Sequence, residues 1–282
     1  MSRGKDYLGP YRRLKMIRPG ATSQIWEVIR DGDSKRLAAK LLQPEYAKKP
    51  EEIELLKHEF EVAHQFRHPN VIEIYEFNID RGTAYLILEL SAFKNLKLMM
   101  RENPDQLLAN ITKIVEQAAE GLKYVHDQGW IHRDIKPDNY LVSDEGDVKL
   151  IDFAIAMRPV TGIAKLFARR SKIAGTRSYM SPEQIRLEAI DFRSDIYSFG
   201  CMLYELVTGK VPYTGLNSDD LLAKHLRAPV PSPTVANNQI TPEFGALLMR
   251  MMGKTREERP GSMDEFLKQF RNMRIFKVKL KG

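Results

Sequence analysis

The first ninety residues place apolar and polar side chains in short alternating or apolar runs. Runs of this length, rich in β-branched and aromatic residues, are typical of β-strands. Between two of them, Leu56, Phe60, Ala63 and Phe66 recur at helical spacing and predict one amphipathic helix. The sequence therefore predicts strands around a single helix, with the strands at residues 11–17, 25–29, 37–42, 71–77 and 84–89.

After Ser91 the pattern becomes helical. Six apolar positions follow one another at steps of three or four residues and predict a long helix with one buried face, which ends at Gly129. These positions are Leu107, Ile111, Ile114, Ala118, Leu122 and Val125. Further apolar helical runs occupy residues 195–207 and 242–252.

The later helices carry recognisable end signals. Thr241 stands where an N-cap is expected, Pro242 suits the first helical position, and Gly253 marks the C-terminal stop. Ser262 and Glu265 have the spacing of a capping box for the last helix. Strands followed by helices predict an α+β fold, with the boundary near residue 91.

The length and composition fit one two-lobed unit. The chain has 282 residues, of which 43% are hydrophobic, enough to bury a sizeable core. Its single cysteine, Cys201, excludes a disulfide framework and lies in an apolar helical run, so we expect it to be buried. No apolar run approaches the roughly 20 residues of a membrane-spanning helix, and the N-terminus lacks a signal core. We expect a cytoplasmic protein, or the cytosolic part of a longer membrane protein.

The net charge of +7 raises the question of an anionic partner. Lysines and arginines are scattered and are not interleaved with aromatic residues, so no specific nucleic-acid binding is expected. We interpret two local concentrations as solvated faces. They are Lys165, Arg169, Arg170 and Lys172, and, near the end, Arg271, Arg274, Lys277, Lys279 and Lys281.

One short segment carries most of the chemistry. Residues 132–139 read HRDIKPDN, so Asp134 is followed five positions later by Asn139, and a second acid, Asp152, opens the run DFA. Phosphoryl transfer from Mg·ATP needs one carboxylate that orients the attacking hydroxyl, and an amide oxygen and a second carboxylate that hold magnesium. Alone, an Asp and an Asn on a loop usually make a capped turn. The rest of the chain must therefore distinguish such a turn from a phosphoryl-transfer site.

Matched this far, the chain resembles the eukaryotic-like (Hanks-type) serine/threonine protein kinases. The runs IDFAIA and SPEQ are similar to those of bacterial members. Other positions agree: Lys40 ends LAAK, Glu59 lies in an amphipathic stretch, and Gly175 and Thr176 precede MSPE at 180–183. Asp195 is the acid of SDIYSFG, and Arg259 stands in ERP.

The resemblance runs from about Tyr11 to about Phe270. It implies a bilobal protein-kinase-like fold whose catalytic domain covers residues 11–270. The domain would divide into a β-rich N-lobe at 11–90 and a helical C-lobe at 91–270, with flanking tails at 1–10 and 271–282.

The resemblance also implies a nucleotide site. Lys40 would pair with the α- and β-phosphates of ATP and with Glu59. The cover loop would contain Ile17, Gly20 and Ser23, the adenine pocket Ile25, Ala38 and Leu141, and the hinge Glu89 and Ser91, next to the gatekeeper Leu88.

The implied catalytic residues lie in the second half of the chain. Asp134 would be the catalytic base or orienter, and Lys136 would contact the γ-phosphate, as in serine/threonine rather than tyrosine kinases. Asn139 and Asp152 would hold Mg²⁺, for which Mn²⁺ could substitute. Two structural roles are implied as well, for His132 and for a buried ion pair of Glu183 with Arg259.

Regulation and partners follow from the same resemblance. Arg133 would bind a phosphate on the activation segment, with Ser171 as the first candidate for phosphorylation and Thr161 as the second. Thr176 would instead contact Asp134 and Lys136. The expected partners are proteins with serine or threonine acceptors, and a transient dimer would allow trans-autophosphorylation.

Two departures from the family pattern leave an alternative open. The three glycine slots of the cover loop hold Arg18, Gly20 and Ser23, and Ala154 replaces the glycine of DFG. Both favour a pseudokinase, a nucleotide-binding or scaffolding module. The intact catalytic and metal positions oppose it, and Lys136 together with the GT…SPE segment disfavours a small-molecule kinase.

Overall fold

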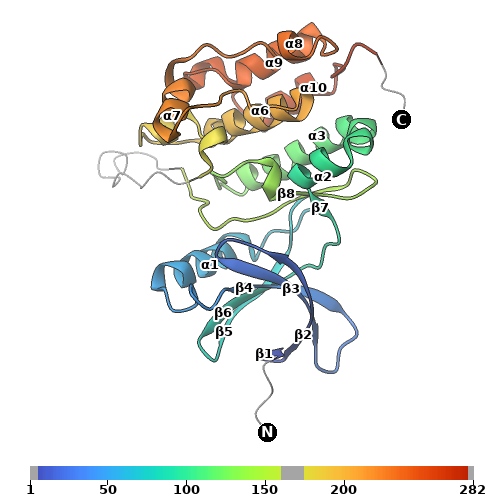
Figure 1. Cartoon of the computed structure of the whole chain (residues 1–282), viewed down its shortest axis with the longest axis vertical. Helices are drawn as coiled ribbons and strands as arrows, with labels where there is room; N and C mark the ends of the chain where they lie inside the picture. The colour runs from blue at the N-terminus through green and yellow to red at the C-terminus, as the bar shows by residue number, and fades with distance from the viewer. Residues whose placement is uncertain (1–5, 160–174, 279–282) are drawn as a thin grey trace. The chain divides into compact units, whose positions relative to one another are not determined.

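The computed structural model describes residues 6–159 and 175–278. The chain forms two compact units (Figure 1). The first contains the chain up to Ala92 together with Asp152–Ala154, and the second contains the other described residues. A unit of strands with one helix and a unit made mainly of helices confirm the predicted α+β class.

The first unit is built on one six-stranded antiparallel sheet with the strand order β1-β2-β3-β4-β6-β5. The strands are β1 (Tyr7–Leu8), β2 (Tyr11–Pro19), β3 (Ser23–Arg30), β4 (Arg36–Leu42), β5 (Ile74–Asp80) and β6 (Thr83–Leu88). The pairing of β3 with β4 runs without interruption from Ser23 opposite Leu42 to Ile29 opposite Arg36. This regular register fixes which side chains share a face with Lys40.

Helix α1 (Pro50–Ala63) packs on β5 and β6 and lies along the sheet in Figure 1. Pro50 occupies its first turn with Glu51 and Glu52, where negative charge suits the helix dipole. Its buried face includes Glu59 beside apolar residues. A carboxylate on a buried face needs a partner, so the helix pattern itself singles out Glu59.

The predicted strands are confirmed, but one begins later than expected. Val71 and Ile72 are buried in the loop before β5, so their apolar character reflects burial and not a strand. Strand β1 was not predicted, because two residues are too few to show the alternation of apolar and polar positions that marks a strand. It is held by the β5–β6 turn, where Asp80 accepts from the Gly9 amide and Arg81 donates to the Tyr7 carbonyl.

The second unit is mainly helical. Its helices are α2 (Leu96–Glu102), α3 (Pro104–Asp127), α5 (Pro182–Ile185), α6 (Phe192–Thr208), α7 (Ser218–Arg227), α8 (Pro233–Ala236), α9 (Pro242–Met251) and α10 (Met263–Phe270). A small sheet joins β7 (Lys94–Asn95), β8 (Tyr140–Val142) and β9 (Val148–Leu150). Short 3₁₀ turns are η1 (Pro137–Asn139), η2 (Arg177–Tyr179) and η3 (Arg256–Glu258).

The helix predictions hold, with small differences at the ends. All six apolar positions of the long helix are buried in α3, which ends at Asp127, two residues before Gly129. Thr241 caps α9 by accepting a hydrogen bond from the Phe244 amide, and the helix ends at Met251. Ser262 caps the Glu265 amide, but the Glu265 carboxylate accepts from the Gly261 amide, so only half of the predicted capping box forms.

Helix α6 lies at the centre of the second unit. It packs on α9, α8 and η2, and its residues from Ser194 to Val207 are all buried. A helix that is buried all round serves as a rigid frame for the elements around it. Cys201 lies here, free and buried as predicted, and burial raises the pKa of its thiol to about 12.

A buried histidine on α7 contacts this frame. The His225 ring forms a 2.9 Å hydrogen bond with the Tyr197 hydroxyl, and the Lys254 ammonium donates to the His225 carbonyl. Burial, and then the charge of Lys254, lower the pKa of His225 to about 4. The folded protein therefore holds this ring neutral at pH values where an unfolded chain would protonate it.

This histidine predicts acid sensitivity. Because the folded pKa is about 4 and the ordinary value is 6.5, unfolding takes up a proton between these values, and stability falls as the pH falls through that window. The contribution is on the order of 3 kcal/mol once the pH is below 4. In denaturant unfolding followed from pH 7 to pH 4, a His225→Gln variant should lose less stability than the parent. The same change at His58, on α1, should leave the fall in stability between pH 7 and pH 4 as in the parent. A parental fall in both variants would contradict this role of His225.

Residues outside the predicted catalytic domain take part in the fold. Ile275 and Phe276 are buried, and the Ile275 carbonyl accepts from the Thr241 amide. Within residues 6–159 and 175–278, no helix is long and apolar enough to cross a bilayer.

Candidate active site

Three charged side chains meet in the first unit. Lys40 projects from β4, Glu59 from α1, and Asp152 belongs to the short segment that joins this unit. The Lys40 Nζ lies 2.7 Å from Glu59 Oε2 and 3.3 Å from Asp152 Oδ1. Burial alone would lower the pKa of Lys40, but the two carboxylates outweigh it and raise the pKa above its ordinary range. The structure thus brings together three of the predicted site residues around one fixed cation.

The segment around Asp152 has an unusual backbone. Asp152 has φ = +69°, a left-handed conformation that non-glycine residues adopt at a cost and that is common at functional sites. The next residue, Phe153, is fully buried and packs edge-on against Phe66 at 5.4 Å. Burial of Phe153 anchors the segment, so the Asp152 carboxylate is held by its neighbour as well as by Lys40.

Two of the residues predicted around adenine, Ile25 and Ala38, and the predicted gatekeeper Leu88 share a face of the sheet with Lys40. Ala38 precedes Lys40 by two positions on β4, Ile25 is the cross-strand partner of Lys40, and Leu88 is that of Ala38. Side chains two apart, or directly opposite, point to the same side. Glu89 follows β6 and its amide donates to the Glu73 carbonyl.

The remaining predicted nucleotide residues lie elsewhere. Ile17 is at the end of β2 with 43% of its surface exposed. Ser91 lies two residues after Glu89 in the first unit, and Leu141 lies half-buried on β8 of the second.

Gly20 makes the tight turn between β2 and β3. Its amide donates to the Ser23 carbonyl at 2.8 Å, and the Gln43 side chain donates to the Gly20 carbonyl. A Cβ at this position would lie 2.8 Å from the Ser23 carbonyl oxygen, too close for any other residue. The middle glycine of the cover loop is therefore required by the turn itself.

Asp134 is the centre of a second group, all of it in the second unit. Its Oδ1 accepts from both the amide and the hydroxyl of Thr176 at 2.8 Å. Its Oδ2 accepts from Lys136 Nζ at 2.6 Å and from Asn139 Nδ2 at 3.1 Å. Lys136 also donates to the Thr176 hydroxyl, as the sequence predicted. Four donors hold the carboxylate in one orientation, which is what positioning an acceptor hydroxyl requires.

The backbone that carries Asp134 is tied to α6. The buried carboxylate of Asp195 accepts from the amides of His132 and Arg133 at 2.7 and 2.8 Å. His126, on α3, reaches the same carboxylate at 2.9 Å. His132 is itself fully buried, with its ring nitrogen 3.0 Å from the Ile151 carbonyl oxygen, which fits the structural role expected of it.

The Arg133 guanidinium has few hydrogen-bond acceptors within the described part of the chain. Its Nη1 donates to the Ile155 carbonyl at 3.3 Å, and its Nε is buried without a hydrogen-bond partner within residues 6–159 and 175–278. The two candidate phosphosites, Ser171 and Thr161, lie outside the described residues.

Two predicted metal ligands, one in each unit, carry oxygen atoms of the kind that a hard cation prefers. Asn139 donates through its amide nitrogen, so its side-chain oxygen is the atom suited to a hard cation, as is the partly exposed carboxylate of Asp152. The described part of the chain contains no cluster of three or more His, Cys, Asp or Glu side chains that could hold a metal ion. Magnesium bound with substrate phosphates needs only one or two carboxylates, so the residues present fit it.

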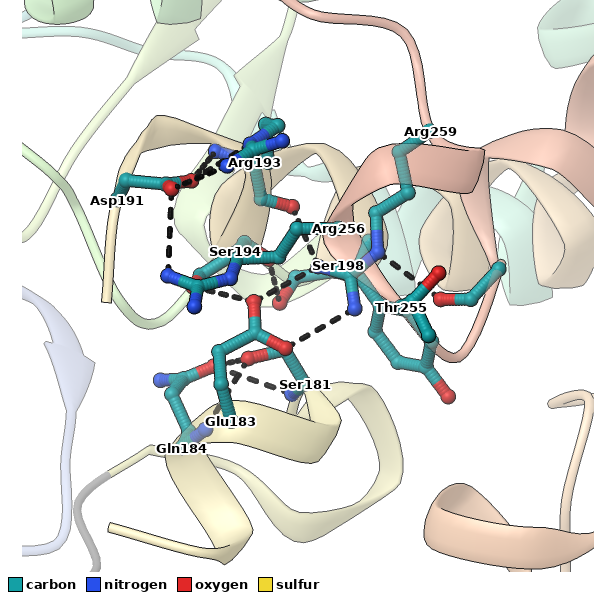
Figure 2. Close-up of polar contacts among 12 residues, drawn as sticks. Ser181, Glu183, Gln184, Asp191, Arg193, Ser194, Ser198, Thr255, Arg256 and Arg259 are labelled. Carbon is teal, nitrogen blue, oxygen red and sulfur yellow. Dashed lines mark hydrogen bonds and ion pairs between the residues drawn. The ribbon is translucent and has the colours of Figure 1, made fainter. Parts of the chain in front are cut away.

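A buried ion pair braces the second unit (Figure 2). Glu183 accepts from Arg259 through both oxygens, at 2.7 and 2.9 Å, and from the Ser194 hydroxyl at 2.6 Å. Arg259 also donates to the carbonyls of Gly253 and Arg193. Burial alone would raise the pKa of Glu183, but the bonds from Arg259 lower it overall. The pair joins α5, α6 and the segment before α10.

Breaking this pair should be costly. An Arg259→Met variant leaves the Glu183 carboxylate buried without its cation, and such losses amount to roughly 3–5 kcal/mol. The matched double variant, Arg259→Met with Glu183→Gln, removes the stranded charge and should regain part of the stability. Urea unfolding of both variants measures the difference. A loss below about 1 kcal/mol in the single variant, typical of exposed pairs, would contradict a bracing role.

Ala154 is compatible with the backbone it occupies. Among the described non-glycine residues, positive φ occurs at Arg81, Arg133, Asp152 and Leu187 but not at Ala154. The glycine of the family pattern is therefore not required by this conformation.

An Ala154→Gly variant is expected to keep or raise phosphoryl transfer, because it frees the backbone beside Asp152 without altering the carboxylate. Stability should fall by about 0.4–1 kcal/mol, because glycine gains more freedom on unfolding. Initial rates and thermal midpoints check both parts. A large drop in rate would show that the Ala154 methyl group has a packing role in the active protein.

Sequence reasoning missed Gln184, on α5. Its buried side chain donates to the Arg133 carbonyl and accepts from Ser181. The S-x-x-Q spacing of Ser181 and Gln184 signals a capping box, and the structure forms one. The second bond, to a residue 51 positions away, has no signal in the sequence.

Comparison with known proteins agrees with this geometry. The family described as "Protein kinase domain" matches residues 11–270. A probable serine/threonine-protein kinase of Clostridium acetobutylicum is 30% identical over 264 residues, covering 94% of this chain and 40% of the relative. The serine/threonine-protein kinase PknA of Mycobacterium tuberculosis is 32% identical over 237 residues, covering 81% and 53%. PknH of Mycobacterium bovis is 30% identical over 261 residues, covering 93% and 43%.

The chain spans about half the length, or less, of these curated relatives. The family match covers most of the chain, and it includes both groups of site residues described above. The predicted family is thereby confirmed: the chain belongs to the protein kinase family, and serine/threonine kinases of bacteria are among its relatives.

Proposed function

We propose that this chain is a serine/threonine protein kinase domain that transfers the γ-phosphoryl group of ATP to a hydroxyl of a protein. The observation that carries the proposal is the arrangement at Asp134, whose carboxylate is held by Lys136, Asn139 and Thr176. A fixed carboxylate next to a lysine suits the alignment of an acceptor hydroxyl beside a phosphate.

Each group of residues supplies one part of this chemistry. In the first unit, Lys40, braced by Glu59, would neutralise phosphate charge. In the second, Asp134 would orient the acceptor hydroxyl and receive its proton, and Lys136 would contact the γ-phosphate. Asn139 and Asp152 would hold Mg²⁺, or Mn²⁺ in its place, which when bound neutralises charge on the transferred group.

The apolar face around Lys40 supports a purine ligand. Ile25, Ala38 and Leu88 share the side of the sheet from which Lys40 projects. We assign Ile25, Ala38 and, in the second unit, Leu141 to adenine, with Glu89 and Ser91 as the hinge. Ile17, Gly20 and Ser23 are assigned to the loop that covers the phosphates.

Regulation is proposed to act through Arg133. Among the described residues its guanidinium makes one carbonyl contact, at Nη1, and its Nε has no partner, which supports pairing with a phosphate. Autophosphorylation at Ser171 or Thr161, in trans within a transient dimer, would supply one.

The type of residue that receives the phosphoryl group identifies the class of kinase. We expect labelled phosphate transferred from γ-labelled ATP to appear as phosphoserine or phosphothreonine after acid hydrolysis of the acceptor protein. Transfer should require a divalent cation and be lost with a chelator. Phosphotyrosine as the main product would contradict the serine/threonine assignment while leaving phosphoryl transfer intact.

A further inference from the structure

We propose that Gln184 is a positioning residue for the catalytic loop: its buried amide holds the Arg133 carbonyl and thereby orients Asp134. The inference rests on the proposed kinase function and adds to it a role for Gln184 that neither the motifs nor the family match assigns.

Both ends of the Gln184 amide are engaged. The oxygen accepts from the amide and the hydroxyl of Ser181, at 3.1 and 2.9 Å, and Figure 2 draws these two side chains joined. The nitrogen donates to the Arg133 carbonyl at 3.0 Å. Because Ser181 needs an acceptor at one end, the other end must be the donor, and that donor faces Arg133.

Arg133 needs such support because its backbone is strained. It has φ = +71°, which costs a non-glycine residue free energy unless the surroundings hold it. Asp195 holds the amide side of Arg133 through a 2.8 Å bond. Gln184 holds the carbonyl side. Side chains from two helices, α6 and α5, thus fix one residue of the catalytic loop.

The carbonyl of Arg133 acts directly on Asp134. The Arg133 carbonyl and the Asp134 amide belong to one planar peptide unit, so fixing the direction of the first fixes the second. Gly175 passes close to this bond: a Cβ there would lie 2.9 Å from the Arg133 oxygen and 3.7 Å from Gln184 Nε2. The close approach brings Thr176 to the Asp134 carboxylate. Gln184 therefore supports the peptide that carries Asp134, next to the segment that orients its carboxylate.

A capping role alone makes a different prediction from a positioning role. In a capping box, Glu and Gln serve equally well at the third position. Gln184→Glu keeps the acceptor for Ser181 but turns the donor that faces Arg133 into an oxygen. If Gln184 only caps α5, the Glu variant should behave like the parent. If it positions Arg133, two acceptors now face one another and Asp134 loses its alignment.

The test compares Gln184→Glu and Gln184→Met with Ser181→Ala, which removes the cap hydroxyl without touching Arg133. Steady-state transfer from Mg·ATP gives kcat and the KM for ATP, and thermal melts of the same samples report folding. We expect both Gln184 variants to lower kcat by roughly 10- to 100-fold, the size of effect that a small misplacement of a catalytic group produces. The KM for ATP should stay within about two-fold, since nucleotide contacts are unchanged. Ser181→Ala should lower the melting midpoint and keep kcat.

A pH profile separates the two Gln184 variants. Once protonated, a buried glutamic acid regains an O–H donor for the Arg133 carbonyl, and burial raises the pKa of a carboxyl group. The kcat of Gln184→Glu, divided by that of the parent, should therefore rise as the pH falls, whereas the ratio for Gln184→Met should stay flat. Flat ratios for both variants, or a kcat of Gln184→Glu equal to the parent, would overturn the inference. No transfer by the parent chain itself would overturn the proposed function instead.

Discussion

An Asp134→Asn variant is expected to lose nearly all phosphoryl transfer while it still binds ATP. The asparagine keeps the shape of the side chain but cannot accept a proton, and it replaces one of the oxygens that accept from Thr176, Lys136 and Asn139. Proton acceptance by a positioned side chain contributes about 10²–10⁴-fold to rates. Initial rates with saturating ATP and direct titration of nucleotide binding measure the two effects separately.

The matched control is Asp138→Asn. Asp138 is exposed in the same loop, four residues further on, so its loss changes the local charge equally but removes no contact to Asp134. Its rate should stay close to that of the parent. Equal loss of nucleotide affinity and of turnover in Asp134→Asn would mean that the residue supports the fold and not the chemistry.

Lys40→Met is expected to cut transfer by roughly 10²- to 10³-fold, the cost of removing one group that stabilises charge in a transition state. Methionine preserves much of the volume of lysine, but it leaves Glu59 and Asp152 as two carboxylates with no cation between them. One of them should then take up a proton, because a buried carboxylate with a like charge nearby has a raised pKa. The rate with saturating ATP and the nucleotide affinity are the measurements.

Lys57→Met provides the control for Lys40. Lys57 lies on α1 and is half exposed, with a weak pair to Glu61 at 3.7 Å. Such pairs contribute about 0–1 kcal/mol, so this variant should behave like the parent in rate and stability. Parental transfer rates in Lys40→Met would show that the assignment of the first-unit site is wrong.

Most of the fold could be predicted because its elements are long and one-sided. Apolar positions that recur every two or about every 3.6 residues predicted β2, β3, β4, β6 and α3 to within a few residues of their observed ends. The errors have physical causes. Val71 and Ile72 are apolar because a loop is buried there, and β1 is too short to show a period.

The site was predictable where chemistry demands particular residue types at particular spacings. Lys40, Glu59 and Asp152 lie together in the structure, as do Asp134, Lys136, Asn139 and Thr176. Backbone conformation was not predictable, because positive φ is uncommon at residues other than glycine and no local pattern marks it at Arg133 or Asp152. Tertiary contacts hold these conformations, and the contacts of Asp195 and Gln184 with Arg133 join residues far apart in the sequence.

Phosphoryl transfer by the chain itself tests the proposed function most directly. The purified chain would be incubated with γ-labelled ATP and Mg²⁺, with and without a generic basic protein, beside the Asp134→Asn variant. We expect label on serine or threonine in the chain or the added protein, dependent on Mg²⁺ and absent with the variant. Binding of ATP without any label on either protein would contradict the proposed function and would identify the chain as a pseudokinase.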